Sequence, residues 1–174
     1  RTWILLLLLS SWGMAAPVAA RDSGIARAEA VPAPADGRPA ASRAGTSASP
    51  ALPQVRLPMS DGGGWWRIDP ASTDPDRVLV VYHPYSAQVS VRLPPSYRAE
   101  TRTIFEPDLD PAHSRRALAF PLSAPGPAFI GIRGARYPLQ VAVLPASEFA
   151  AADRTHTQVL FTSIGVLVGV SLVA

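Results

Sequence analysis

The 174-residue chain contains no cysteine and no lysine. Without cysteine it can form neither a disulfide nor a thiolate metal site, although many exported bacterial proteins also lack disulfides. All 16 basic residues are therefore arginines, which we interpret mainly as the codon bias of a GC-rich genome. The net charge of +3 is spread along the chain without a long run of like charges. This pattern argues against a nucleic-acid-binding protein.

Signatures of catalysis and of metal binding are also missing. The three histidines, His83, His113 and His156, are far apart and lack the close spacing of metal ligands. No Gly-x-Ser-x-Gly segment is present, and the three glycines that follow Asp61 lack the Lys-Ser/Thr of a phosphate-binding loop. We therefore expect no cofactor, no metal and no enzymatic activity in this chain.

The N-terminal stretch has the pattern of an export signal. Arg1 is followed by an apolar run from Trp3 to Leu9, and Val18-Ala19-Ala20 fits a signal-peptidase site. We predict a signal peptide over residues 1–20, with an uncleaved signal anchor as the alternative. Since the first residue is not Met, we also expect the start to be truncated.

Residues 21–60 are rich in Ala, Pro, Ser, Gly and Arg and contain few bulky apolar side chains. Such a composition buries too little surface to offset the entropy lost on ordering. The composition therefore predicts a disordered linker, and a Pro-rich docking site is the alternative.

Short strand-like runs follow, separated by turns that contain proline. In the run Gln88–Leu93, for example, Val89, Val91 and Leu93 alternate with polar residues, which is typical of a half-buried strand. We predict a mainly β domain over residues 61–145, a jelly-roll-like sandwich. The expected strands are Trp65–Ile68, Arg77–His83, Gln88–Leu93, Arg102–Phe105, Ala117–Leu122, Phe129–Arg133 and Leu139–Leu144.

The domain is followed by one apolar helix. Ser147 can cap a helix that begins at Glu148, whose negative charge suits a helix N-terminus. The 17 residues from Gln158 to Ala174 carry no charge, which is near the lower limit for crossing a bilayer. We predict a juxtamembrane and transmembrane helix over residues 146–174, truncated where the sequence stops.

Trp65 and Trp66 are the first candidates for ligand binding. Alternation along a strand directs one indole inward and the other outward. An outward indole beside Arg67 could stack on a sugar ring. Packing in the core and at its rim is the competing interpretation of the pair.

Four arginines form a second candidate site. Arg102, Arg115, Arg116 and Arg133 could converge on an anionic ligand, because guanidinium groups bind carboxylate and phosphate well. Alternatively, Arg133 pairs with Asp108 or Asp110 inside the domain.

The C-terminal elements occur in a distinctive order: Phe129 to Arg133, Leu139 to Leu144, the segment Phe149 to Arg154, and Gly165 with Gly169. This order resembles the junction between the periplasmic jelly roll and the first helix of bacterial seven-transmembrane receptors with diverse intracellular signalling modules. The resemblance covers roughly residues 62–174 and includes no catalytic signature. The chain lacks the family's other six helices and its cytoplasmic module.

The resemblance implies a periplasmic ligand sensor, anchored in the bacterial inner membrane, that signals to a cytoplasmic diguanylate cyclase or histidine kinase absent from this chain. Whether the full-length protein is an enzyme therefore stays open. Arg133 matches a recurrent arginine of the family, and the ligand would be a carbohydrate or another small periplasmic molecule. Gly165 and Gly169 would pack inside the helix bundle, with homodimerisation as the alternative. The competing function is a membrane-tethered sandwich that binds another envelope protein.

Overall fold

The computed structural model describes residues 24–33, 54–57, 63–105 and 116–173. The predicted signal peptide lies outside the described residues. The elements, in chain order, are β1 (Ile25–Val31), β2 (Val55–Arg56), β3 (Gly63–Pro70), β4 (Arg77–Tyr82), β5 (Gln88–Arg92), β6 (Ala99–Arg102), β7 (Ala117–Leu122), β8 (Ala128–Arg133), β9 (Gln140–Pro145) and α2 (Ala146–Val173).

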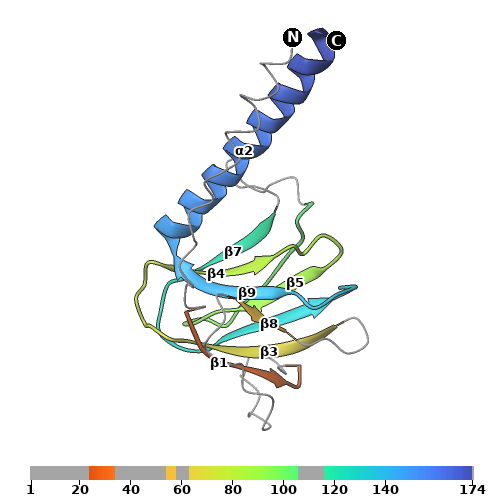
Figure 1. The fold of residues 1–174 in the computed structure, drawn as a ribbon. Helices are drawn as coiled ribbons and strands as arrows, with labels where there is room; N and C mark the ends of the chain where they lie inside the picture. The colour runs from red at the N-terminus through yellow and green to blue at the C-terminus, as the bar shows by residue number, and fades with distance from the viewer. Residues whose placement is uncertain (1–23, 34–53, 58–62, 106–115, 174) are drawn as a thin grey trace.

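The strands form two antiparallel sheets that pack face to face (Figure 1). Sheet A has the order β1-β3-β8-β5-β6, and sheet B has the order β2-β9-β4-β7. Strands β2 to β9 therefore follow the order of two interlocked Greek keys, which is the jelly-roll arrangement, and β1 adds a fifth strand at the edge of sheet A. The predicted fold class is confirmed.

The core lies between the two sheets and follows from the period-two pattern of the strands. In β5, Val89 and Val91 are fully buried whereas Gln88 is exposed, as the sequence predicts. Trp66 and Ile68 of β3 meet Leu79 of β4 and Phe120 of β7 in the same cluster. Each buried side chain of this size contributes about 1.5–3 kcal/mol of transfer free energy.

Strand β6 lies three residues earlier than the sequence suggested. The apolar pair Ile104-Phe105 pointed to a strand over Arg102–Phe105, but those two residues form a turn. The strand is Ala99–Arg102, which pairs with β5 through backbone hydrogen bonds. As the edge of sheet A, it can be polar on most of its surface.

Strands β1 and β2 correct the prediction that residues 21–60 form a disordered linker. Residues 25–31 pair with β3 along its length, and residues 55–56 pair with β9. The other linker residues, apart from those flanking the two strands, lie outside the described part. The prediction failed here because alanine, which makes up much of β1, has a small apolar side chain and a low strand propensity.

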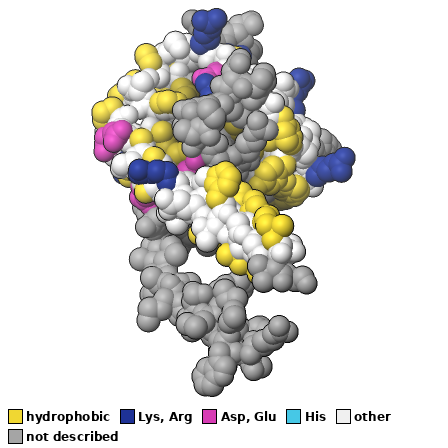
Figure 2. Space-filling model, turned by 90° about the horizontal axis from the view of Figure 1, so that it is seen from above, with side chains coloured by type: hydrophobic (Ala, Val, Ile, Leu, Met, Phe, Trp, Pro, Cys, Tyr) yellow, Lys and Arg dark blue, Asp and Glu magenta, His cyan; other side chains and the backbone are white. Residues whose placement is uncertain are grey.

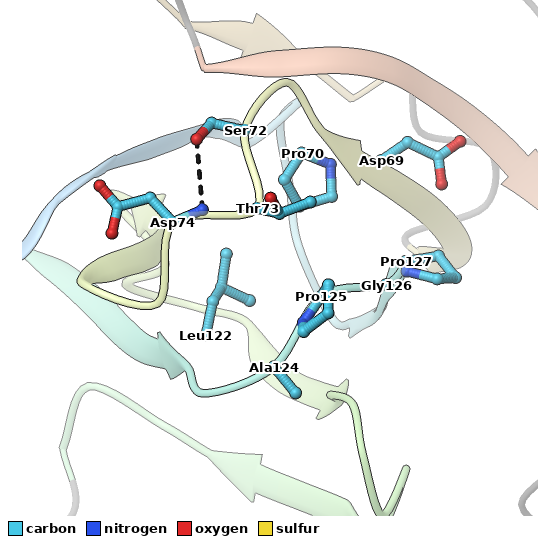
Figure 3. A pocket seen from close by; sticks show the side chains of 10 residues that line it. All are labelled: Asp69, Pro70, Ser72, Thr73, Asp74, Leu122, Ala124, Pro125, Gly126 and Pro127. Carbon is cyan, nitrogen blue, oxygen red and sulfur yellow. Dashed lines mark hydrogen bonds between the residues drawn. The ribbon is translucent and has the colours of Figure 1, made fainter.

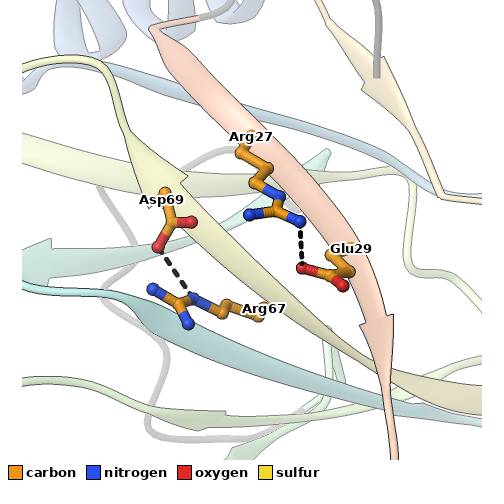
Figure 4. A network of polar contacts seen from close by, with 4 residues as sticks. All are labelled: Arg27, Glu29, Arg67 and Asp69. Atoms are coloured by element: carbon orange, nitrogen blue, oxygen red, sulfur yellow. Dashed lines mark hydrogen bonds and ion pairs between the residues drawn. The ribbon is translucent and has the colours of Figure 1, made fainter. Parts of the chain in front are cut away.

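Charge pairing with β3 stabilises β1, which has few large apolar side chains. Arg27 lies opposite Asp69 and Glu29 lies opposite Arg67, so opposite charges face each other across the two strands. Within each strand the charges also pair, Arg27 with Glu29 at 3.0 Å and Arg67 with Asp69 at 2.9 Å (Figure 4). Since a one-residue slip would remove this complementarity, the four charges help to fix the register of β1.

Strand β9 continues directly into α2. The helix begins at Ala146, two residues before the predicted start, and the Ala146 amide donates a hydrogen bond to the Asp76 carbonyl at 3.0 Å. Three residues later Phe149 is buried against Val78 and Val80 on the outer face of sheet B. The first turns of the helix are therefore part of the packed domain.

The rest of α2 extends away from the sandwich (Figure 1). It is long and apolar enough to cross a membrane, and hydrophobic side chains lie along it in the view from above (Figure 2). Added Cβ atoms at Gly165 and Gly169 would meet no atom within 4 Å. The face that carries these glycines is therefore open within the described residues.

Phe149→Ala tests the packing of α2 on sheet B. Removing the ring should cost about 3 kcal/mol and should separate the first helical turns from the sheet. We expect faster amide hydrogen exchange over residues 146–153 than in the unmodified chain, with β3 and β8 unchanged. Phe161→Ala, which alters an exposed ring of the same helix, is the control. Equal exchange in both variants would contradict the packing role.

Candidate functional site

The outer face of sheet A carries the candidate site. Alternation along β3 places Trp65, Arg67 and Asp69 on this face and places Trp66 and Ile68 in the core. Across the sheet, Trp65 lies opposite Gly131 of β8, which lies opposite Ser90 of β5. We call the surface formed by Trp65, Arg67, Ser90 and Thr101 the platform.

Trp65 lies over β8 because Gly131 leaves room for it. A Cβ atom added at Gly131 would come within 2.5 Å of two carbon atoms of the Trp65 indole. The ring therefore packs directly against backbone and remains partly exposed on its other side. Such a flat, partly exposed indole suits stacking on a ring-shaped ligand.

Polar groups surround the indole. Arg67 is one-third exposed and bonds Asp69 with its Nε atom, which leaves its two terminal nitrogens for another acceptor. The hydroxyls of Ser90 and Thr101 bond each other at 2.8 Å. Arg92 also projects from this side, and its buried Nε has no hydrogen-bond partner among the described residues. The platform thus combines one apolar ring with several donors.

Tyr97 borders the platform from the loop between β5 and β6. Its ring meets Phe129 edge-on, with 6.0 Å between ring centroids, and its backbone adopts a left-handed conformation with φ of 51°. This conformation is rare for a bulky residue and indicates that the surrounding packing holds it in place. Burial raises the pKa of the Tyr97 hydroxyl, with Arg67 acting in the opposite direction and Asp69 in the same one.

A pocket of about 200 Å³ adjoins the platform at the end of the sandwich. It lies between the loop after β3 and the loop before β8, and Asp69 belongs to both the pocket and the Arg67 pair. Figure 3 shows Asp69 and Asp74 at opposite sides of this pocket, with Ser72 bonded to the Asp74 amide. A ligand on the platform could extend a substituent towards this pocket.

The four ligand-binding residues predicted from the sequence do not all lie on the same face of sheet A. Trp65, Arg67 and Arg133 project from the same face of sheet A. Trp66 does not: it is 3% exposed and belongs to the core, because the neighbouring residue takes the outward position. Asp69, Ser90 and Thr101 were not identified from the sequence as residues in or next to the site. The alternation of Asp69 and Ser90 with apolar residues could have indicated that these two face outward.

The predicted convergence of arginines does not occur among the described residues. Arg102 pairs with Glu100, and its guanidinium carbon lies 5.8 Å from the centre of the Phe120 ring on the inner side of sheet A. Arg133 lies on the outer side of that sheet, and Arg116 lies beside α2. Arg115, Asp108, Asp110 and His113 fall outside the described residues.

In the part of the chain that the structure describes, no group of three or more His, Asp or Glu residues could hold a metal ion. Comparison with protein-family models, with curated proteins and with solved structures gives no match for this chain. The platform is therefore interpreted from its own chemistry.

Gly131→Ala tests whether the glycine seats the indole. The added methyl group must displace Trp65, because the two would otherwise come within 2.5 Å of each other. We expect a changed Trp65 environment in near-UV circular dichroism and a small loss of stability, since the partly exposed ring can rotate outward. Gly64→Ala is the matched control, because its methyl would meet buried Trp66 at 2.7 Å and should cost more, about 1–3 kcal/mol. An unchanged Trp65 signal in Gly131→Ala would contradict this placement.

Proposed function

We propose that this chain is the ligand-sensing part of a membrane receptor, comprising an extracytoplasmic sandwich and a first transmembrane helix. The sandwich binds a small molecule on the platform, and α2 transmits the change across the inner membrane to a cytoplasmic output module outside this sequence. The signal-like start of the sequence supports a periplasmic orientation of the sandwich.

The connection between β9 and α2 carries the proposal. No residue separates the last strand from the helix, and two further contacts hold the junction: the Ala146–Asp76 hydrogen bond and the buried Phe149 ring. A tilt of sheet B would therefore move the helix with it. A simple tether to the membrane needs no such rigidity, which favours the receptor over the competing envelope-binding module.

The platform chemistry favours a carbohydrate or a similarly hydroxylated ring. A sugar presents an apolar ring face to Trp65 and hydroxyls to Arg67, Ser90 and Thr101. Exposed Arg133, two residues beyond Gly131, would add positive charge for an acidic substituent. These contacts are few and exposed, so we expect a weak to moderate affinity.

Trp65→Ala tests the ligand site. A panel of neutral and acidic monosaccharides would be titrated against the unmodified chain and the variant, with binding followed by calorimetry. For any sugar that binds, losing the stacking surface should weaken affinity by about tenfold. Tyr85→Ala, which removes an exposed ring from the turn between β4 and β5, should bind normally. Equal affinity in all three proteins would place the ligand elsewhere.

Insertion of Gly-Gly after Pro145 tests the transmission. The insertion separates β9 from α2 and should abolish ligand-dependent output of the full-length receptor in membranes while preserving sugar binding. The matched control is the same insertion after Tyr85, in the exposed turn between β4 and β5, which should preserve both. Normal output with the hinge after Pro145 would refute transmission through this junction, whereas lost binding would show that the domain had unfolded.

A further inference from the structure

A groove runs along the first turns of α2, away from the platform. It is an open depression with a volume of about 500 Å³. The helix lines it with Ala151, Ala152, Thr155, His156 and Val159, and Arg116 lines it from the residue just before β7. Glu148, in the first turn of α2, also borders it. The two alanines leave the space that a larger side chain would fill.

The groove extends from the sandwich to the start of the apolar segment. Glu148 belongs to the packed turns of α2, whereas Val159 lies within the uncharged run that begins at Gln158. With a rise of about 1.5 Å per residue, these two ends are about 16 Å apart along the helix. If α2 crosses a bilayer, Thr155 and His156 therefore lie at the level of the lipid headgroups.

Arg116 supplies a guanidinium group to the lining of the groove. Arg116 is partly buried and makes no ion pair within the described residues. His83 lies in the same neighbourhood: burial lowers its pKa, and the positive charges of Arg116 and His156 lower it further. The acidic residue of the groove, Glu148, stands about two turns of helix before His156. Since Arg116 has no carboxylate partner in an ion pair within the described residues, its guanidinium group is available to an anionic ligand in the groove.

We propose that this groove binds an anionic phospholipid of the surrounding bilayer. The phosphate lies between the guanidinium group of Arg116 and the imidazole of His156, and an imidazole N–H can donate a hydrogen bond to it. The acyl chains descend along Val159 and the apolar helix. The bound lipid would brace α2 against the sandwich at the membrane surface. The inference rests on the membrane insertion of α2 but not on the ligand of the platform.

The test uses the whole chain in lipid nanodiscs made of phosphatidylcholine with or without phosphatidylglycerol. Native mass spectrometry after gentle release counts the phosphatidylglycerol molecules that remain bound. We expect preferential retention of phosphatidylglycerol and about tenfold weaker retention in Arg116→Gln, because a charge-assisted hydrogen bond to phosphate is lost. Arg98→Gln, at an exposed turn of the sandwich, removes the same charge elsewhere and should retain lipid normally.

A second pair of variants tests the shape of the groove without changing any charge. Ala152→Leu fills the groove and should expel the lipid, whereas Ala150→Leu, which alters an exposed position of the same helix outside the lining, should not. The proposal would be overturned if both leucine variants and Arg116→Gln retained as much phosphatidylglycerol as the unmodified chain.

Crosslinking identifies the occupant. Because the chain has no native cysteine, a photoreactive label on Thr155→Cys reacts from one position only. A crosslink to phosphatidylglycerol is expected, and a crosslink to another polypeptide segment instead of lipid would overturn the proposal. Sedimentation of the chain with membranes after alkaline washing reports the membrane insertion of α2 separately. A chain that inserts but does not retain phosphatidylglycerol is therefore distinguishable from a chain that does not insert.

Discussion

The alternation of side chains along β3 is the constraint on which the rest of the structure depends. Trp66 and Ile68 enter the core while Trp65 and Arg67 face outward, and β3 pairs with β1 on one side and β8 on the other. A slip of one residue would expose Trp66, bury Arg67 and remove the charge pairing with β1. One register therefore determines the core, the platform and the position of the first strand together.

Much of the sandwich could be predicted because most of its strands alternate apolar and polar residues or form short apolar runs. The limits of β4, β5, β7, β8 and β9 lie within one residue of the predicted ones. Strand β1 was missed because its inward residues, such as Ala28, carry little hydrophobic signal. Its position depends on Arg67 and Asp69, which lie some forty residues away in the sequence, and a local pattern cannot indicate such a pairing.

The candidate site was only partly predictable for the same reason. Alternation implied that one of Trp65 and Trp66 faces outward, but the choice between them required the position of β3 in its sheet. The space for the indole comes from Gly131, a residue of another strand. Tyr97 reaches the platform through a loop whose conformation is set by packing against Phe129 and Gly126. Contacts of this kind become visible only when the fold has brought the segments together.

The order of the last three elements gives the platform a short covalent route to α2. Strand β8 supports the Trp65 ring at Gly131 and carries Arg133, and residues 134–139 connect it to β9. Strand β9 then enters α2 without an intervening residue. Since β8 belongs to sheet A and β9 to sheet B, this route crosses from the platform sheet to the sheet on which Phe149 packs. A displacement of β8 relative to sheet B would therefore reach the helix both through the chain and through the core between the sheets. Both routes end at the residues that anchor α2. The sandwich can therefore affect the orientation of the helix only while these residues remain packed against sheet B.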